Sequence, residues 1–389
     1  MKIAILSSGI LPIPAVQGGA VENLIDFYLA YNDQKKLHHI TVFSTYHPAV
    51  KKHKALKSNF NQYYYIKTNS FWFKIKKRIY QEFNPKGFYY SSIELFYEHI
   101  VHQLKRDSFD LFILENRPAF ALKLRKEFPQ TPIITHLHTN TIHIKEPKVK
   151  EIISSTNAFI VVSEYIKKEI ENVGVSAQIT VVYNGIDTRL FNNHVLPIDR
   201  KSLGFDEKDF IIVFSGRLVK DKGIKELLLA IKELKEDRNI KLLVIGSEDF
   251  SKNTEQSPFI LKLHEIAKSI EDKIRFTGFI PYSELPHYYA TADVMVVPSH
   301  INEAFGMTCI EASAIGLPII ATNDGGIPET LIGQKHILID KGPNMPIQIA
   351  KAINKIKNNY SDYKGNKLKP IFTKNTYASS FFEAIKELL

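Results

Sequence analysis

The fold class is clearest in residues 210–246, which read FIIVFSGRLVKDKGIKELLLAIKELKEDRNIKLLVIG. An apolar run opens this stretch, a segment with apolar residues at helical spacing follows, and a second apolar run closes it. Short runs that are apolar almost throughout are typical of parallel strands buried on both faces, and a helix usually connects two such strands. The stretch therefore predicts a β-α-β unit.

The same alternation extends in both directions from this unit. Short β-branched runs recur along the chain, most of them bounded by Pro, Asn or Gly, with helical stretches between most of them. Repeated strand–helix units predict an α/β fold with parallel sheets. The predicted strands are KIAILSS (2–8), HHITVFS (38–44), FDLFILE (109–115), TPIITHLH (131–138), NAFIVVS (157–163), ITVVYN (179–184), FIIVFSG (210–216), IKLLVIG (240–246), KIRFTGF (273–279), DVMVVPS (293–299) and PIIATN (318–323).

A polar, irregular segment at 187–209 separates two series of these units. A chain of 389 residues is also long enough for two domains. We therefore expect two doubly wound Rossmann-like domains, 1–192 and 193–370, and a last helix within 371–389. Ligands of open parallel sheets bind beyond the carboxyl ends of the strands, so two such domains facing each other are expected to form a central cleft.

The composition is that of a globular protein that needs no covalent staples, with 44% apolar and 24% charged residues. The single Cys309 cannot form an intrachain disulfide, which favours the cytoplasm. Residues 1–16 resemble a signal peptide, but their uninterrupted apolar run, 3–6, is shorter than the ~7–15 residues of an h-region. No stretch approaches the ~18 apolar residues of a membrane span. We expect a first strand and a loop at this end of the sequence.

The net charge of +10 predicts an anionic partner, which could be nucleic acid, anionic lipid or a phosphorylated small molecule. Residues 71–83, FWFKIKKRIYQEF, interleave cations with aromatic and aliphatic residues. This pattern favours a helix that lies on an anionic membrane surface, and the alternative is a solvated helix packed through its Phe and Ile side chains. The predicted membrane contacts are Phe71, Trp72, Lys74, Lys76, Lys77 and Arg78.

Two sets of residues just after predicted strands could contact phosphate. Gly18 and Gly19 stand before a predicted helix, where paired glycines allow close backbone approach and a helix N-terminus attracts an anion. A flexible turn is the alternative, since G-x-G-x-x-G and Walker A sequences are both missing. Arg217 and Lys222 lie in the turn after 210–216, where a planar fork and a mobile point charge could hold a diphosphate. They could equally be two surface cations.

His136 and His138 lie at the end of another predicted strand. We expect their side chains to point to opposite sides of the sheet, one of them toward the cleft. A His pair could bind a metal, but H-E-x-x-H, a Cys partner and D-x-D are all missing from the sequence. We therefore predict no metal site.

Glu303 and Glu311 frame the segment EAFGMTCIE. On one helix they would be ~12 Å apart, whereas the paired carboxyls of glycosidases lie ~5–9.5 Å apart. A helix that begins near Gly306 would leave Glu303 in the preceding loop. The pair therefore suits the two ends of an elongated ligand, with the amides of 306–308 near a negative charge at its middle.

These segments together resemble a known family. Residues 298–329, PSHINEAFGMTCIEASAIGLPIIATNDGGIPE, resemble the signature of the retaining GT-B glycosyltransferases of family 4, which use nucleotide sugars. The resemblance covers nearly the whole chain, is weakest at 51–97, and implies the GT-B fold with a C-terminal helix that crosses back to the N-terminal domain. Further similar segments are QGGAVE (17–22), VVSEYIKKEI (161–170), VVYNGIDTRLF (181–191), GRLVKDKG (216–223) and FTGFIPYSELPHYYATADVMVVPS (276–299).

The resemblance also implies roles for single residues. Glu311, as a charged acceptor, would bind the ribose hydroxyls, and Glu303 would contact the hydroxyls of the transferred sugar. Arg217 and Lys222 would clamp the diphosphate, and His138 would lie beside the reacting sugar, whereas His136 has no matching role. The implied donor-binding residues are Gly18, Gly19, Arg217, Lys222, Phe279, Ile280, Glu303, Phe305, Gly306, Met307, Thr308 and Glu311, and the implied catalytic residues are His138, Glu303, Arg217 and Lys222.

The expected activity is a retaining, metal-independent transfer of a hexosyl group from a nucleotide-diphosphate donor, expected to be a UDP-sugar. The acceptor would be a glycan or a lipid-linked molecule in lipopolysaccharide, capsule or glycolipid synthesis. The enzyme would need no cofactor, bind no nucleic acid and attach peripherally to the inner face of the plasma membrane. The alternatives are a GT-B phosphorylase, a sugar-nucleotide epimerase, or a non-catalytic basic scaffold that binds membrane or nucleic acid.

Overall fold

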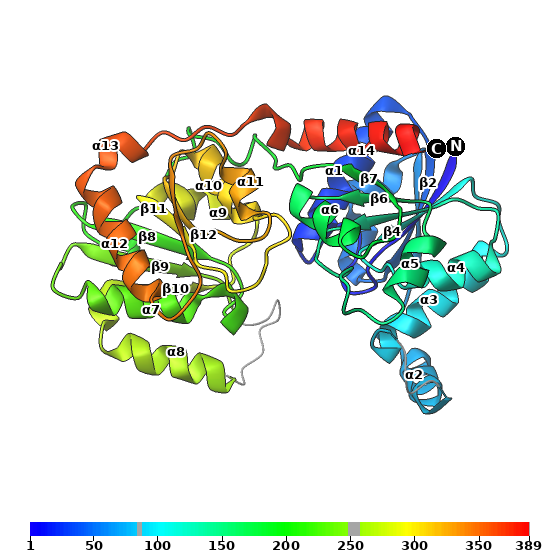
Figure 1. Ribbon diagram of the computed structural model, residues 1–389, viewed down its shortest axis with the longest axis horizontal. Coiled ribbons are helices and arrows are strands. Elements are labelled where there is room, and N and C mark those ends of the chain that lie inside the picture. The colour runs from blue at the N-terminus through cyan, green and yellow to red at the C-terminus, as the bar shows by residue number, and fades with distance from the viewer. Residues whose placement is uncertain (84–87, 248–256, 389) are drawn as a thin grey trace. The chain divides into compact units, whose positions relative to one another are not determined.

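A computed structural model describes residues 1–83, 88–247 and 257–388 of the chain. Their contacts divide the chain into two compact units (Figure 1). Unit 1 consists of Met1–Gly185 and Lys374–Leu389, and unit 2 consists of Ile186–Thr373. The divisions at 185 and 373 lie a few residues from the expected 192 and 370. Each unit contains one parallel sheet with helices around it, which is the predicted α/β class.

Unit 1 is built on a seven-stranded sheet in the order β3-β2-β1-β4-β5-β6-β7. All of its strand pairs are parallel. The edge strand β3 was not predicted, because its sequence NQYYYI is not apolar throughout as a central strand would be. The strands are β1 (Lys2–Leu6), β2 (His39–Thr45), β3 (Asn61–Ile66), β4 (Leu111–Glu115), β5 (Ile133–Leu137), β6 (Ala158–Val161) and β7 (Gln178–Val181).

Helices cover both faces of this sheet, and the alternation along β1 shows why. Ile3 and Ile5 lie in a buried cluster with α1 and α14, whereas Ala4 and Leu6 lie in a second cluster with α3 and α4. Successive residues of a strand point to opposite faces, so each face of β1 supports its own layer. The helices are α1 (Ala20–Lys35), α2 (Phe71–Phe83), α3 (Ser91–Leu104), α4 (Phe120–Glu127), α5 (Val149–Ser155), α6 (Glu164–Glu171) and α14 (Lys374–Leu388).

The last helix, α14, completes the core of unit 1 (Figure 1). Its Phe381 ring stacks on Tyr28 of α1 with centroids 4.1 Å apart, and its Phe382 ring meets the edge of the same tyrosine at 6.2 Å. Tyr377 is also buried against this layer. Since burial of one large apolar side chain contributes roughly 1.5–3 kcal/mol, α14 supplies a substantial part of the stability of unit 1.

Unit 2 is built on a six-stranded parallel sheet in the order β10-β9-β8-β11-β12-β13. Of its strands, the short edge strand β13 was not predicted. The strands are β8 (Phe210–Ser215), β9 (Ile240–Ile245), β10 (Ile274–Gly278), β11 (Val294–Val297), β12 (Ile319–Thr322) and β13 (His336–Ile339). The helices are α7 (Ile224–Glu233), α8 (Pro258–Lys268), α9 (Leu285–Thr291), α10 (Met307–Ile315), α11 (Ile327–Leu331), α12 (Met345–Asn358) and α13 (Tyr360–Tyr363).

Both sheets have the strand order of a doubly wound fold, with unit 1 extended by β7. The order reverses between β1 and β4 in unit 1 and between β8 and β11 in unit 2. Loops that follow these strands are where such folds bind ligands. In the described part of the chain, no helix is both long enough and apolar enough to span a bilayer.

Candidate active site

In unit 2 the loops after β8 and β11 are fixed to each other. The chain turns into α7 at Gly223, whose φ is 70° and where a Cβ atom would lie only 1.8 Å from the backbone oxygen of Pro298. The backbone oxygen of Asp221 accepts a hydrogen bond of 2.8 Å from the amide of His300. Only glycine allows this approach, so it sets where the preceding cations, Arg217 and Lys222, lie relative to the loop after β11.

Lys222 and Glu303, two of the predicted donor contacts, form an ion pair. The Ser299 hydroxyl donates a 2.6 Å hydrogen bond to the same Glu303 oxygen, Oε1. Both charged side chains are half-buried, and Arg217 is exposed in the turn after β8. The structure therefore brings together a carboxylate and a cation that the sequence placed more than 80 residues apart.

A second glycine pair, Gly325 and Gly326, packs against the loop that holds Glu303. This pair was not among the predicted site residues. The amide of Gly326 donates a 2.7 Å hydrogen bond to the backbone oxygen of Glu303. A Cβ atom at Gly325 would lie 2.3 Å from that oxygen. Lys341 pairs with Asp324 and also donates to the Asn302 side chain at 2.8 Å. The signal in the sequence was the Gly-Gly pair at 325–326, which follows the predicted strand at 318–323 after one residue.

The helix α10 begins at Met307, as predicted, and Gly306 with a φ of 113° precedes it. The N-terminal amides of an α-helix have no intrahelical acceptor and carry a partial positive charge, so the start of α10 can bind an anion. Phe305 is buried beneath this turn, while Met307 and Thr308 are half-buried. Glu303 lies in the loop before α10 and Glu311 lies within it, which confirms the predicted placement of the two carboxyls.

Glu311 is buried, and the Tyr289 hydroxyl of α9 donates a 3.1 Å hydrogen bond to its Oε2. Burial raises the pKa of Glu311 to about 8, although this hydrogen bond lowers it. The side chain is therefore mostly protonated at pH 7 in the free protein. In the free protein the low polarity around Glu311 therefore disfavours the charge that was expected there.

The predicted base contacts follow β10. Phe279 comes directly after the strand and is 53% exposed, and Ile280 is half-buried. The amide of Gly246 donates to the backbone oxygen of Gly278 at 2.9 Å, which joins the ends of β9 and β10. The main chain at 279–280 therefore lies at the same carboxyl edge of the sheet as the other candidate residues.

In unit 1, Gly18 and Gly19 lie directly before α1, with φ values of 78° and 101°. A Cβ atom at Gly19 would lie 2.1 Å from Oε2 of Glu22, so the glycine makes room for this buried carboxyl at the start of the helix. Burial raises the pKa of Glu22 to about 7, against the opposing effect of its own backbone amide. Glu22 was not among the predicted site residues.

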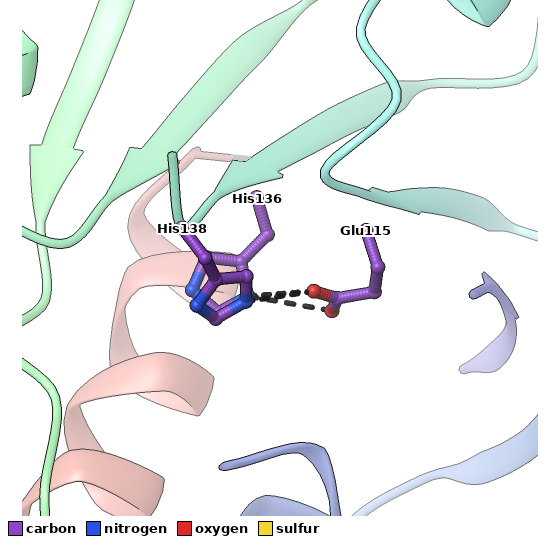
Figure 2. Close-up of side chains that lie close together, drawn as sticks. All are labelled: Glu115, His136 and His138. Atoms are coloured by element: carbon purple, nitrogen blue, oxygen red, sulfur yellow. Dashed lines mark hydrogen bonds and ion pairs between the residues drawn. The ribbon is translucent and has the colours of Figure 1, made fainter. Parts of the chain in front are cut away.

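Glu115, His136 and His138 form a cluster at the ends of β4 and β5 (Figure 2). Nε2 of His138 lies 3.0 Å from Oε2 of Glu115, and Nδ1 of His136 lies 3.3 Å from Oε1. The expectation that the two imidazoles point to opposite sides is wrong. Side chains two residues apart on a strand point to the same face, and both rings accordingly meet one carboxylate, with centroids 4.1 Å apart.

Neighbouring groups hold this cluster in place. The Tyr28 hydroxyl donates a 2.8 Å hydrogen bond to Oε1 of Glu115. Oδ1 of Asn116 accepts a 3.1 Å hydrogen bond from the amide of His138. Burial alone would raise the pKa of Glu115, but the two imidazoles outweigh it and lower the pKa to about 2. Burial lowers the pKa of His138 to about 4, so the cluster contains an ionised carboxylate beside a neutral His138 at pH 7.

Among the described residues, these three are the group whose ligand atoms lie close enough together to hold a metal ion. A histidine that binds a metal usually donates its other N–H to a second partner. Within the described chain, Nε2 of His136 and Nδ1 of His138 are buried and have no hydrogen-bond partner. Glu115 also already accepts from Tyr28. The arrangement therefore fits a hydrogen-bonded cluster better than a metal site.

The predicted membrane segment forms α2, which packs on α3 at the periphery of unit 1 (Figure 1). Phe73 is buried in the core of the unit. Phe71 and Trp72 are each 71% exposed, and Ile79 is 51% exposed. Of the four cations, Lys74, Lys76 and Arg78 are exposed and Lys77 is half-buried. The helix is therefore anchored by Phe73, with Tyr80 packed against the same cluster, and presents Phe71 and Trp72 to solvent together with its cations.

Two family models match consecutive parts of this chain. Glycosyltransferase Family 4 matches residues 34–190, and Glycosyl transferases group 1 matches residues 197–377. The putative glycosyltransferase YtcC of Bacillus subtilis is 29% identical over 91% of this chain and 83% of its own length. The lipopolysaccharide 1,2-N-acetylglucosaminetransferase of Salmonella typhimurium is 28% identical over 57% of each chain.

Solved structures show the same fold. HepE of Anabaena, crystallised with UDP-glucose, superposes over the full length of both chains with a TM-score of 0.71 at 20% sequence identity. At this identity the similarity concerns the fold. It shows that two Rossmann-like domains of the GT-B type, as predicted, are what this sequence builds.

Proposed function

We propose that this chain, which belongs to the group 1 glycosyltransferases, transfers a sugar from a nucleotide-diphosphate donor to a glycan or lipid-linked acceptor. The observation that carries the proposal is the arrangement in unit 2. Two cations, Arg217 and Lys222, lie in the loop that is fixed against the one leading into α10. Glu303 stands before that helix and Glu311 within it. An anion with polar groups on either side, as in a nucleotide sugar, matches this order of charges.

The parts of the donor are assigned by chemistry. The diphosphate is placed at the N-terminus of α10 with Arg217 and Lys222, because helix amides and cations both favour phosphate. Glu303 receives the sugar hydroxyls and Glu311 the ribose hydroxyls. The base is placed against the main chain of 279–280. We favour a UDP-sugar because HepE, which shares the fold, was crystallised with one.

Transfer breaks the bond between the sugar C1 and the diphosphate oxygen while the acceptor oxygen bonds to C1. We assign retention of configuration, with attack on the face that the diphosphate leaves and transfer of the acceptor proton to a leaving phosphate oxygen. Lys222, which is paired with Glu303 in the structure, would exchange this contact for the phosphate. The protein then contributes positioning and stabilisation of the leaving charge.

Arg217, Lys222 and the helix N-terminus supply the positive charge that a metal provides in other transferases, so we infer that no metal is needed. The product is placed in surface polysaccharide or glycolipid synthesis. This placement is supported by the similarity to the lipopolysaccharide 1,2-N-acetylglucosaminetransferase of Salmonella typhimurium. We assign binding of the acceptor to unit 1, where Gly18, Gly19 and His138 follow the strands β1 and β5.

The test begins with a thermal-shift screen of the purified protein against UDP-, GDP- and TDP-sugars. With the donor that binds, release of nucleoside diphosphate and labelling of an acceptor are measured. Arg217→Ala and Lys222→Ala should each lower turnover by roughly 10–150-fold, the value of hydrogen bonds to a charged group. Lys220→Ala removes a nearby exposed cation and should leave turnover unchanged.

Each alternative gives a different result in this assay. A phosphorylase would form a sugar 1-phosphate only when inorganic phosphate is present. An epimerase would change the sugar without releasing the nucleotide. A scaffold would bind no nucleotide sugar. Any of these outcomes would contradict the proposed transfer, as would wild-type turnover in Lys222→Ala.

We also infer that the protein attaches to the anionic inner face of the plasma membrane through α2. This 13-residue helix carries four cations and three exposed large apolar side chains, Phe71, Trp72 and Ile79. Contact of these apolar side chains with water is unfavourable. Tyr90, just before α3, is 83% exposed and adds a further aromatic side chain nearby. Cations near an anionic surface contribute about 1 kcal/mol each, and aromatic side chains favour the interface.

Co-sedimentation with liposomes tests this attachment. Binding should be strong with anionic vesicles, weak with neutral ones and reduced by salt. Changing the four cations of α2 to Gln should abolish it with little change in melting temperature, since none of them is buried. The matched control changes four exposed cations of unit 2 to Gln and should still bind; these are Lys232, Lys235, Lys262 and Lys268. Binding that ignores lipid charge would contradict the proposal.

A further inference from the structure

We propose that Glu115 is a positioning residue that fixes His138 in one tautomer, with hydrogen on Nε2, so that Nδ1 accepts a hydrogen bond from a hydroxyl of the bound substrate. The inference rests on the proposed function, because the hydroxyl belongs to the sugar donor or its acceptor. Glu115 itself is fully buried and contacts Tyr28, His136 and His138, so it would act on the substrate only through His138.

The tautomer follows from the contact between His138 and Glu115 (Figure 2). Their atoms Nε2 and Oε2 are 3.0 Å apart, and a carboxylate can only accept a hydrogen bond. The histidine must therefore donate from Nε2. Since this imidazole is neutral at pH 7, Nδ1 carries a lone pair and no hydrogen. The opposite tautomer would place a lone pair against the carboxylate and leave a buried N–H without an acceptor.

Further contacts also hold the His138 imidazole and Glu115 in this orientation. Asn116 holds the backbone of His138 through a 3.1 Å hydrogen bond and also accepts from the Thr139 hydroxyl at 2.9 Å. Tyr28 and His136 contact the other carboxylate oxygen of Glu115, Oε1. These contacts fix the carboxylate, and its pKa of about 2 keeps it ionised as an acceptor for Nε2.

The free nitrogen is the observation that points to a ligand. Nδ1 of His138 is buried and has no hydrogen-bond partner in the described chain, and the side chain is only 2% exposed. Buried polar atoms without a partner are uncommon in native proteins, and each calls for an explanation. His138 follows β5 at the carboxyl edge of the sheet, where this fold binds its ligands, so a substrate hydroxyl is the partner that fits. A carboxylate behind the imidazole makes Nδ1 a stronger acceptor.

Glu115→Gln tests the inference because it keeps the shape and replaces one acceptor oxygen with an NH2 group. In protein labelled with 15N-histidine, nitrogen chemical shifts should show His138 with hydrogen on Nε2 in the wild type and a changed tautomer in the variant. Turnover should fall about tenfold or more with little change in donor KM, since the hydrogen bond supports the reacting geometry. Tyr28→Phe, which removes a different donor to Glu115, should leave the tautomer unchanged.

Outcomes of this experiment separate the possibilities. An unchanged His138 tautomer and unchanged turnover in Glu115→Gln would overturn the inference. If the wild type transferred no sugar, the proposed function would fail, while the tautomer measurement would still decide the role of Glu115. Binding of Zn²⁺ or Co²⁺ in calorimetry, lost in Glu115→Gln, would show instead that the cluster is a metal site. A melting temperature close to that of the wild type identifies a positioning effect, and His138→Asn should show the same loss of turnover.

Discussion

Nucleotide binding is expected to expel a proton from Glu311. Burial raises the pKa of this side chain to about 8, so about nine-tenths of the molecules carry the proton at pH 7. Ribose hydroxyls that donate to Glu311 would favour its ionised form, because a carboxylate accepts stronger hydrogen bonds than a carboxylic acid does. We therefore predict the release of nearly one proton for each nucleotide bound at pH 7.

The affinity for the nucleotide should follow this ionisation. Ionising Glu311 at pH 7 costs about 1.4 kcal/mol, which offsets much of the roughly 1.5–3 kcal/mol expected for hydrogen bonds to a charged group. Raising the pH from 7 to 9 removes this cost and should increase the affinity for UDP about tenfold. Glu311→Gln keeps a carbonyl acceptor but cannot ionise, so its affinity should change little with pH and should differ most from the wild type at pH 9.

Titration calorimetry with UDP, in two buffers that differ in ionisation enthalpy, measures both the affinity and the number of protons released. Glu265→Gln, at an exposed position of α8, serves as the matched control and should behave like the wild type. Equal proton release from the wild type and Glu311→Gln would refute the reasoning. A wild-type affinity that is independent of pH between 7 and 9 would show that the ribose does not meet this carboxyl.

Three further predictions concern stability and cofactor use. Gly223→Ala should destabilise unit 2 by more than the ~1 kcal/mol of backbone strain alone, because its Cβ would meet a backbone oxygen at 1.8 Å. Chemical denaturation measures the loss, and Gly174→Ala is the control because Gly174 has a similar φ but open space around it. The free energy of unfolding should fall as pH rises from 5 to 8, because burial raises the pKa of Glu22 and Asp26 to about 7 and of Glu311 to about 8. Over this range the native protein keeps protons that the unfolded chain has lost, and each group contributes up to about 1.4 kcal/mol per pH unit. A melting temperature that rises over this range would contradict the prediction. Turnover should survive EDTA, and a loss that Mg²⁺ or Mn²⁺ restores would show that a metal is needed.

The sequence was sufficient for most of the fold because buried parallel strands have an unusual pattern, apolar throughout and regularly followed by helices. It failed at β3 and β13, where a strand at the edge of a sheet is only partly buried and its pattern weakens. The start of α10 was predicted because Gly306 is a local signal. Local signals of this kind depend on a few neighbouring residues and do not require knowledge of the sheet order.

The site was predicted less completely, because its contacts join segments that are distant in the sequence. Glu115 meets His138 only because β4 and β5 are neighbours in the sheet, and the two residues are 23 positions apart. Tyr289 meets Glu311 across 22 positions because the helices α9 and α10 pack against each other. Pairings of this kind require the three-dimensional arrangement. The error over His136 and His138 was of another kind, because side chains two residues apart on a strand share one face.

The packing of α14 on α1 also has a consequence for the order in which the protein is made. Residues 1–185 leave the ribosome first, yet part of their core belongs to a helix that is translated only after the whole of unit 2. At 5–20 residues per second this delay is roughly 10–40 s. During that interval unit 2, whose chain is continuous, can fold on its own, while Tyr28 still lacks the Phe381 ring on which it stacks. A nascent chain halted before residue 374 should therefore expose apolar surface on its N-terminal part and be a target for chaperones.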